Sequence, residues 1–255
     1  MTKPLILVTN DDGVTSPGIK ALVEVALEFG EVVVVAPDKA QSGMGHAITL
    51  EDTLRKKEVN LFEGAIAFSC TGTPVDCVKL AVNVFLDRKP DLIVSGINHG
   101  SNASVNVIYS GTMSAAVEGA MEKIPAIGFS LLDHALEAHF DTAKKYAAII
   151  IQKTLKKGLP EGVCLNVNFP KLGEAEIAGI KICRQCNGNW TEEFDERKDP
   201  SGKEYYWLTG VFENYEPEAT DTDIWALDNG YVSIVPVHSD MTAYITIDEL
   251  NNWNL

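Results

Sequence analysis

The chain has 255 residues, 45% hydrophobic and 22% charged, enough for the core of one large α/β domain, with or without an appendage. Its net charge of −15, from 36 acidic and 21 basic residues, makes nucleic-acid polymers and anionic membranes poor partners. No apolar stretch approaches about 20 residues, no signal-peptide pattern opens the chain, and the odd cysteine count fits reduced thiols. We therefore expect a cytoplasmic protein that binds neither nucleic-acid polymers nor membranes.

Apolar runs alternate with helical patterns up to about residue 170. This alternation predicts an α/β fold, in which a mostly parallel sheet carries helices on both faces. The expected strands cover residues 4–9, 31–36, 91–95, 126–130 and 164–169, and the expected helices cover 19–29, 73–85, 112–122 and 138–157. Residues 46–70 alternate in a strand-like way, which suggests a hairpin at the edge of the sheet.

The pattern changes after Pro170, where aromatic residues become interleaved with charged ones. Residues 180–218 are expected to form a β-hairpin arm, followed by a short helix at 221–228 and a last strand at 231–236. An isolated hairpin is marginal in water, and exposed aromatic patches usually mark an interface. We therefore expect the arm to pack on a partner subunit within a single-domain protein of residues 1–255.

Two adjacent aspartates, Asp11 and Asp12, stand where the first apolar run stops. The run reads as a strand buried on both faces, and Asn10 to Gly13 as the turn at its carboxyl end, the edge where α/β sheets bind ligands. Neighbouring carboxylates repel each other and are costly to bury, and a bound cation relieves both problems. The alternative is a solvated turn in which Asp bonds its own backbone.

Two further oxygen ligands are expected at this edge, Ser42 from the loop after the second strand and Asn98 from the segment after Ser95. Each alone is more simply a residue with ordinary loop hydrogen bonds. Together with Asp11 and Asp12 they offer carboxylate, hydroxyl and amide oxygens, a set that suits Mg²⁺, Mn²⁺ or Ca²⁺ rather than zinc or copper. The sequence thus predicts one divalent cation per subunit.

A helix start at Ser110, Gly111 and Thr112 follows shortly after Asn98. Its free backbone N–H groups and hydroxyls can form an anion cradle, although every helix needs such a cap. His46 and His99 occupy glycine-containing loops of the same region and are equally candidates for a general acid or for solvent-facing residues.

Five ordered motifs carry a resemblance to a known family: Thr9 to Gly13 with Pro17-Gly18, Ala36 to Asp38 with Ser42-Gly43, Gly72 to Pro74 with Asp76-Cys77, Ser95 to Asn98, and Tyr109 to Thr112. They resemble those of the stationary-phase survival protein family (SurE), which are 5′/3′-nucleotidases. The match extends to residues 165–168, 222–223 and 240–242. The chain departs from the family pattern at Ala103, Ser104 and Asn106, in the loop through which substrate would enter.

The resemblance implies a divalent metal held by Asp11, Asp12, Ser42 and Asn98. It implies phosphate contacts from Asn98 and from the turn formed by Ser110, Gly111 and Thr112. It further implies a Rossmann-like core and a C-terminal arm exchanged between the subunits of a homodimer or homotetramer. The function expected is metal-dependent hydrolysis of nucleoside 5′- and 3′-monophosphates, with Asp11 and Asp12 as catalytic residues.

Two questions stay open at this level. The nucleophile is either water or Asp11. Haloacid-dehalogenase phosphatases also place aspartates after a first strand, but separate them by one residue, whereas Asp11 and Asp12 are adjacent. The alternative from another class is a protein that senses nucleotides or phosphate with the same site and does not turn them over.

Overall fold

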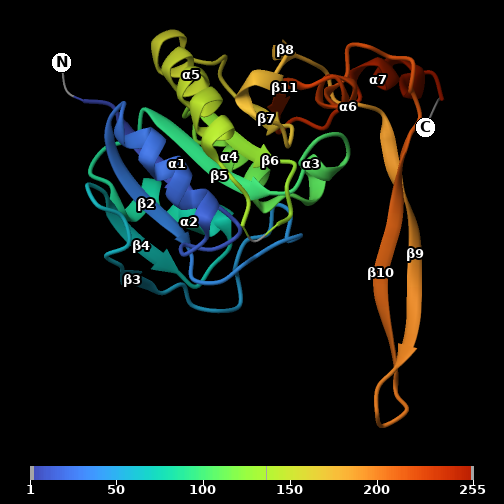
Figure 1. Ribbon diagram of the computed structural model, residues 1–255, viewed down its shortest axis with the longest axis horizontal. Helices are drawn as coiled ribbons and strands as arrows, with labels where there is room; N and C mark the ends of the chain where they lie inside the picture. Colours follow the sequence, from blue (N-terminus) through green and yellow to red (C-terminus); the bar gives the residue numbers. More distant parts are fainter. Residues whose placement is uncertain (1–2, 136, 254–255) are drawn as a thin grey trace.

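The computed structural model describes residues 3–135 and 137–253. A nine-stranded sheet forms its centre, in the order β3-β4-β2-β1-β5-β6-β7-β11-β8 (Figure 1). Neighbouring strands are parallel except at the β3–β4 edge pair and between β7 and β11. The strands are β1 (Leu5–Thr9), β2 (Glu31–Pro37), β3 (Lys56–Glu58), β4 (Ile66–Cys70), β5 (Leu92–His99), β6 (Ala126–Leu131), β7 (Val163–Phe169), β8 (Gly179–Ile182) and β11 (Tyr231–His238).

Helices cover both faces of the sheet, so the predicted α/β class is confirmed. Along β1, Ile6 and Val8 pack with α1 and α5, whereas Leu5 and Leu7 pack with α2 and α4 on the opposite face. This alternation explains why the first strand reads as a continuous apolar run. The helices are α1 (Pro17–Leu27), α2 (Pro74–Leu80) with a π-helical continuation (Ala81–Phe85), α3 (Asn106–Tyr109), α4 (Gly111–Met121), α5 (Asp141–Lys157), a 3-10 turn (Glu174–Glu176), α6 (Asp223–Asp228) and α7 (Tyr244–Asn251).

None of the helices in residues 3–135 and 137–253 is long and apolar enough to cross a membrane. The sequence did not predict α3 or α7, the first because it is a single turn. Helix α5 begins at Asp141, three residues later than expected.

The predicted edge hairpin is present only in its second part, as β3 and β4. Residues before β3 form a loop because side chains of the α2 cap take their backbone hydrogen bonds. Thr73 donates its hydroxyl to the carbonyl of Ala47 at 2.7 Å, and Asp76 accepts the Thr49 N–H at 3.1 Å. The loop that carries Ser42 is thereby tied to the start of α2.

Strand β5 continues beyond its expected end at Ser95 and includes Asn98. Its register with β6 shifts between Ser95 and Asn98, and such an irregularity changes the direction of the end of the strand. Helix α1 packs against this bend: a Cβ on Gly18 would lie 1.9 Å from the carbonyl oxygen of Ile97. Only glycine permits this approach, which explains the Pro17-Gly18 pair in the sequence.

The hairpin arm consists of β9 (Gly188–Lys198) and β10 (Glu204–Asn214), which form a separate two-stranded sheet. It extends away from the main sheet (Figure 1). Several of its aromatic side chains are exposed, including Phe194 at 63% and Trp207 at 60%. The paired part of the arm is shorter than the predicted 180–218, because β8 pairs with β11 in the main sheet.

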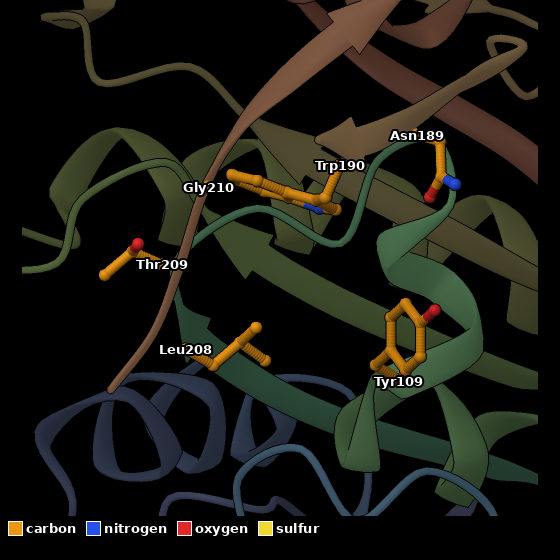
Figure 2. Close-up of a pocket in the computed structure, with 6 residues that line it drawn as sticks. All are labelled: Tyr109, Asn189, Trp190, Leu208, Thr209 and Gly210. Carbon is orange, nitrogen blue, oxygen red and sulfur yellow. The ribbon is translucent and has the colours of Figure 1, made fainter. Parts of the chain in front are cut away.

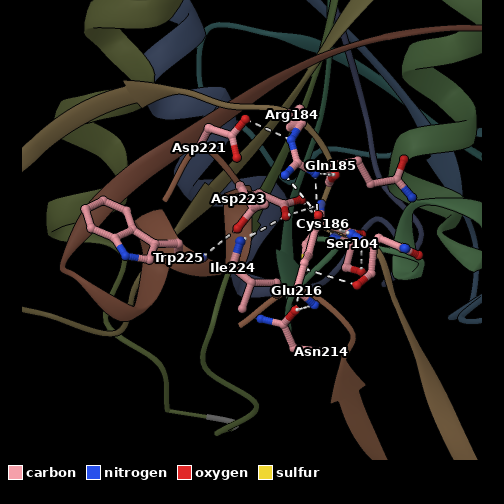
Figure 3. A network of polar contacts seen from close by, with 12 residues as sticks. Ser104, Arg184, Gln185, Cys186, Asn214, Glu216, Asp221, Asp223, Ile224 and Trp225 are labelled. Atoms are coloured by element: carbon pink, nitrogen blue, oxygen red, sulfur yellow. Dashed lines mark hydrogen bonds and ion pairs between the residues drawn. The ribbon is translucent and has the colours of Figure 1, made fainter. Parts of the chain in front are cut away.

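A buried carboxylate, Asp223, joins the base of this arm to the loop that follows β5 (Figure 3). Its Oδ2 accepts the Ser104 N–H at 2.8 Å, and its Oδ1 accepts the Cys186 N–H at 2.9 Å. Ser104 also donates its hydroxyl to the Cys186 carbonyl at 2.8 Å and holds a φ of +53°, which favours glycine. The Asp223 contacts therefore stabilise a loop in which the backbone conformation of Ser104 is unfavourable by itself.

Two buried asparagines of β7 fix the same loop from the sheet side, through its residue Asn102. Asn168 accepts the Asn102 N–H at 2.8 Å, and Asn166 donates to the Asn102 carbonyl at 2.8 Å. The Asn102 side chain in turn donates to the Ser130 hydroxyl at 2.8 Å. Strands β6 and β7 thus support the segment that leads from β5 to α3 and α4.

We predict that Asp223→Asn lowers the free energy of unfolding by about 2–3 kcal/mol, because an amide group cannot accept hydrogen bonds at both of its ends. Urea unfolding of the two proteins measures the difference. Asp221→Asn is the matched control, since Asp221 is exposed and its pairing with Arg184 contributes little. Equal effects of the two substitutions would contradict this assignment.

Candidate active site

The carboxyl ends of β1, β2 and β5 and the start of α4 lie together at one edge of the sheet, as the parallel order of these strands requires. Asp11 and Asp12 follow β1. The loop after β2 crosses directly beside them, because the Gln41 N–H donates to the Asp11 carbonyl at 2.7 Å. These contacts bring the predicted site residues from separate parts of the sequence into one neighbourhood.

Asp11 is buried, with 4% of its surface exposed, against the first turn of α4. Its Oδ1 accepts a hydrogen bond from the Thr112 hydroxyl at 2.5 Å. A Cβ on Gly111 would lie 2.7 Å from the Asp11 Cβ, so only glycine at this position lets the carboxylate reach the helix start. The pKa of Asp11 is raised to about 6, mainly because the carboxyl is buried; the Thr112 hydrogen bond lowers it, and the charge of the neighbouring Asp12 raises it.

Asp12 is half-buried and faces the end of β5. Its Oδ2 accepts the backbone N–H of His99 at 3.3 Å. Burial raises its pKa too, whereas this N–H and the His99 ring favour the charged form. The two carboxylates therefore sit in an environment that penalises their combined negative charge, which a cation would offset.

Asn98 lies one residue before His99, on the same strand end. Its Nδ2 donates to the Gly100 carbonyl at 2.9 Å. This bond uses one of the two amide hydrogens, so the second is left for an anion, and the amide oxygen is the atom that Asn98 can offer to a cation.

Ser42 is exposed in the loop after β2, next to the residue that bonds the Asp11 backbone. The loop is also held at Gly45, whose N–H donates to the Tyr109 carbonyl at 3.0 Å. The structure therefore brings Ser42 to the aspartate turn through its backbone neighbours.

Ser110, Gly111 and Thr112 form the start of α4, as the sequence predicts. The Ser110 hydroxyl caps the helix by accepting the Met113 N–H at 3.0 Å. The Met113 and Ser114 N–H groups are thus both bonded to Ser110. The N–H groups of Gly111 and Thr112, in contrast, have no partner within the helix and can bind an anion beside Asp11 and Asp12.

The two candidate acids occupy different surroundings. His99 touches the site, through the N–H that Asp12 accepts, and its ring packs edge-on against Phe140 at 5.3 Å between centroids. His46 instead contacts Glu118 at 3.0 Å, about 9 Å further along α4 than Thr112. Burial alone would raise the pKa of Glu118, but its bonds with His46 and Lys79 bring it below the usual value. Of the two histidines, only His99 is in direct contact with a predicted metal ligand.

Asn10 is a site residue to which the sequence assigned no role of its own. Its Nδ2 donates to the Gly13 carbonyl and to the Ser16 hydroxyl, both at 2.9 Å. Gly13 has a φ of +93°, which closes the turn. The sequence does contain a pattern that predicts this role, an asparagine before two aspartates and a glycine, since Asn often stabilises such turns.

The donor set fits a hard cation. In the part of the chain that the structure describes, no three His, Cys, Asp or Glu side chains are grouped so that they could hold a metal ion. At the aspartate turn the candidate ligands are instead two carboxylates, an amide and a hydroxyl. Their oxygens suit Mg²⁺, Mn²⁺ or Ca²⁺, with water in the remaining positions.

Comparisons with known proteins identify the family of this chain. The profile of the family described as "Survival protein SurE" matches residues 6–192. The 5′-nucleotidase SurE of Flavobacterium psychrophilum is 61% identical, with 100% of this chain and 99% of that protein covered. The 5′-nucleotidase SurE of Christiangramia forsetii is 62% identical, with 99% and 98% covered.

The crystal structure of the SurE protein from Aquifex aeolicus has the same fold. It superposes with a TM-score of 0.85 at 40% sequence identity, covering 99% of this chain and 100% of that one. The sequence profile, the full-length relatives and the solved structure lead to one conclusion. The chain belongs to the survival protein SurE family.

Proposed function

We propose that this SurE protein hydrolyses nucleoside 5′- and 3′-monophosphates with one divalent cation bound at the Asp11–Asp12 turn. It is an enzyme of the 5′-nucleotidase class, as its full-length relatives at 61–62% identity are. The names of these relatives mention neither a cation requirement nor activity on 3′-monophosphates, and both are part of our proposal. The observation that carries the proposal is the buried Asp11 carboxylate, which lies between a second carboxylate and the N-terminus of α4.

Asp11, Asp12, Ser42 and Asn98 are the residues that would hold the cation. When bound, the cation supplies charge compensation for the phosphoryl oxygens and activates the attacking group. Mg²⁺ or Mn²⁺ suits this oxygen set, and Ca²⁺ can substitute in binding.

The protein's own groups orient the phosphate. The N–H groups of Gly111 and Thr112 at the start of α4 would bind its oxygens, with Asn98 at the opposite side of the cradle. The Thr112 hydroxyl is donated to Asp11, so it positions the carboxylate and not the phosphate. Asp11 is fixed by Thr112 and by the close packing against Gly111, so the cation and the phosphate would meet in a defined geometry. His99, next to Asp12, is the better placed of the two histidines to protonate the leaving oxygen.

The alternative function is a nucleotide or phosphate sensor that uses the same site without turnover. The names of the full-length relatives favour the enzyme. Release of phosphate from a simple phosphomonoester distinguishes the two functions.

The substrates are expected to be small nucleotides in the cytoplasm. The negative net charge disfavours nucleic-acid polymers and anionic membranes as partners. All five cysteines are unpaired and buried, which suits a reducing compartment.

We also propose that the protein is a homodimer or homotetramer in which the hairpin arm packs on a partner subunit. The exposed aromatic residues of β9 and β10 support this, since such a surface is unfavourable in water.

Chelation is expected to abolish phosphate release from both 5′- and 3′-monophosphates, and Mg²⁺ or Mn²⁺ should restore it. The reason is that the buried carboxylates need a cation to present a phosphate-binding site. Phosphate release measured before EDTA, after EDTA and after metal addition decides the point. Full activity in excess EDTA, with metal absent by elemental analysis, would be incompatible with this mechanism.

Asp12→Asn should lower kcat about 100-fold or more at saturating metal, because it removes negative charge from the proposed metal ligands while keeping the shape. Circular dichroism should show an unchanged fold. Asp52→Asn serves as the matched control, since Asp52 is exposed and bonds the neighbouring Thr53 N–H. An Asp12→Asn enzyme as active as this control would mean that the aspartates only form a turn.

The joint substitution of Tyr205 and Trp207 by Ser should weaken the assembly, since it removes aromatic surface from the arm, and leave the metal site complete. Light scattering coupled to size exclusion gives the mass of each protein. A wild-type mass equal to one chain at micromolar concentration would refute the proposed role of the arm.

A further inference from the structure

A pocket of about 430 Å³ lies between the base of the hairpin arm and helix α3 (Figure 2). Trp190 and Leu208 line it from the arm, and Tyr109 lines it from α3. The complete lining is Tyr109, Asn189, Trp190, Leu208, Thr209 and Gly210, and none of these six residues is charged. The pocket therefore suits an uncharged planar group better than a second phosphate.

Trp190 is fixed in orientation although it is 40% exposed. Its indole Nε1 donates to the Asn106 Oδ1 at 2.7 Å, and its ring packs edge-on against Phe212 at 5.9 Å. Asn106 in turn donates to the Ser101 carbonyl at 3.2 Å. The indole is thus held by the loop that follows β5, and one large face of an aromatic ring is prepared for a ligand.

Tyr109 connects this pocket to the phosphate cradle. It is the last residue of α3 and directly precedes Ser110, the cap of α4. Its backbone is fixed because its carbonyl accepts the Gly45 N–H at 3.0 Å. The pocket and the phosphate cradle are thus lined by consecutive residues, so the two lie next to each other.

We propose that this pocket is the nucleobase subsite, in which the base of the substrate stacks on Trp190 and Tyr109. The inference rests on the proposed nucleotidase function, since it extends the same site from phosphate to base. Aromatic stacking is available to every base, so the subsite separates nucleotides from sugar phosphates and discriminates weakly among bases. Asn189 adds a side-chain amide that can both donate to and accept from a base edge.

The test compares two substrates that share the ribose and the phosphate, AMP and ribose 5-phosphate. Trp190→Ala should lower kcat/KM for AMP roughly tenfold or more, the loss expected for one stacking contact. It should change kcat/KM for ribose 5-phosphate less than about twofold, within the scatter of a surface substitution. Trp190→Phe, which keeps an aromatic face, should recover most of the loss for AMP.

Trp207→Ala is the matched control, because Trp207 lies on the same hairpin and does not line the pocket. A selective loss for AMP confined to Trp190 supports the subsite. An equal loss for both substrates in Trp190→Ala would overturn it, since Trp190 would then act by holding Asn106 and the cradle. An equally selective loss in Trp207→Ala would also overturn it and assign the effect to assembly.

Binding of adenosine, measured by calorimetry, separates this inference from the proposed function. Adenosine should bind the wild-type protein and bind Trp190→Ala roughly tenfold more weakly or worse. If the wild-type protein bound adenosine in this Trp190-dependent way and hydrolysed neither substrate, the nucleotidase function would fail and the subsite would stand. If both proteins bound adenosine equally, or neither did, the subsite would be wrong whatever the turnover.

Discussion

The contact between the Asp11 carboxylate and the first turn of α4 is the constraint on which the rest of the site depends. Asp11 is almost completely buried beside a second carboxylate, an arrangement that water cannot stabilise. The Thr112 hydroxyl and the positive end of the α4 dipole offset part of the cost. In the proposed function, the remainder would drive the binding of a cation, so the group that costs the fold stability would also serve its activity.

The surrounding layers of the structure keep this contact in place. The loop that carries Ser42 is tied to the Asp11 and Tyr109 carbonyls and to the Asp76 carboxylate of the α2 cap by its own backbone N–H groups. The segment between β5 and α4 is held by asparagines from β7 and by Asp223. These supports come from distant parts of the chain, and they account for the burial of Asn166, Asn168 and Asp223, which the catalytic proposal does not use directly.

The sheet, the helix layers on its two faces and the aspartate turn could be predicted from the sequence, because each is marked by a local pattern of residues. The continuous apolar run of β1 followed by Asp11 and Asp12 is such a signal, as is the Thr73-Pro74 helix start. Features that depend on contacts between distant parts of the chain could not be predicted in this way. The extension of β5 through Asn98 depends on pairing with Ser130, and the orientation of Trp190 depends on Asn106, 84 residues away.

The central claim is that a divalent cation binds between β1, β5 and the loop after β2. Anomalous diffraction from crystals soaked in Mn²⁺ tests it most directly, since it locates the metal without relying on turnover. The account predicts one manganese peak per subunit, in contact with oxygens of Asp11, Asp12 and Asn98 and close to Ser42. The same soak of Asp12→Asn crystals should give a weaker peak at that place. A manganese peak elsewhere in the subunit, with none at the aspartate turn, would contradict the account.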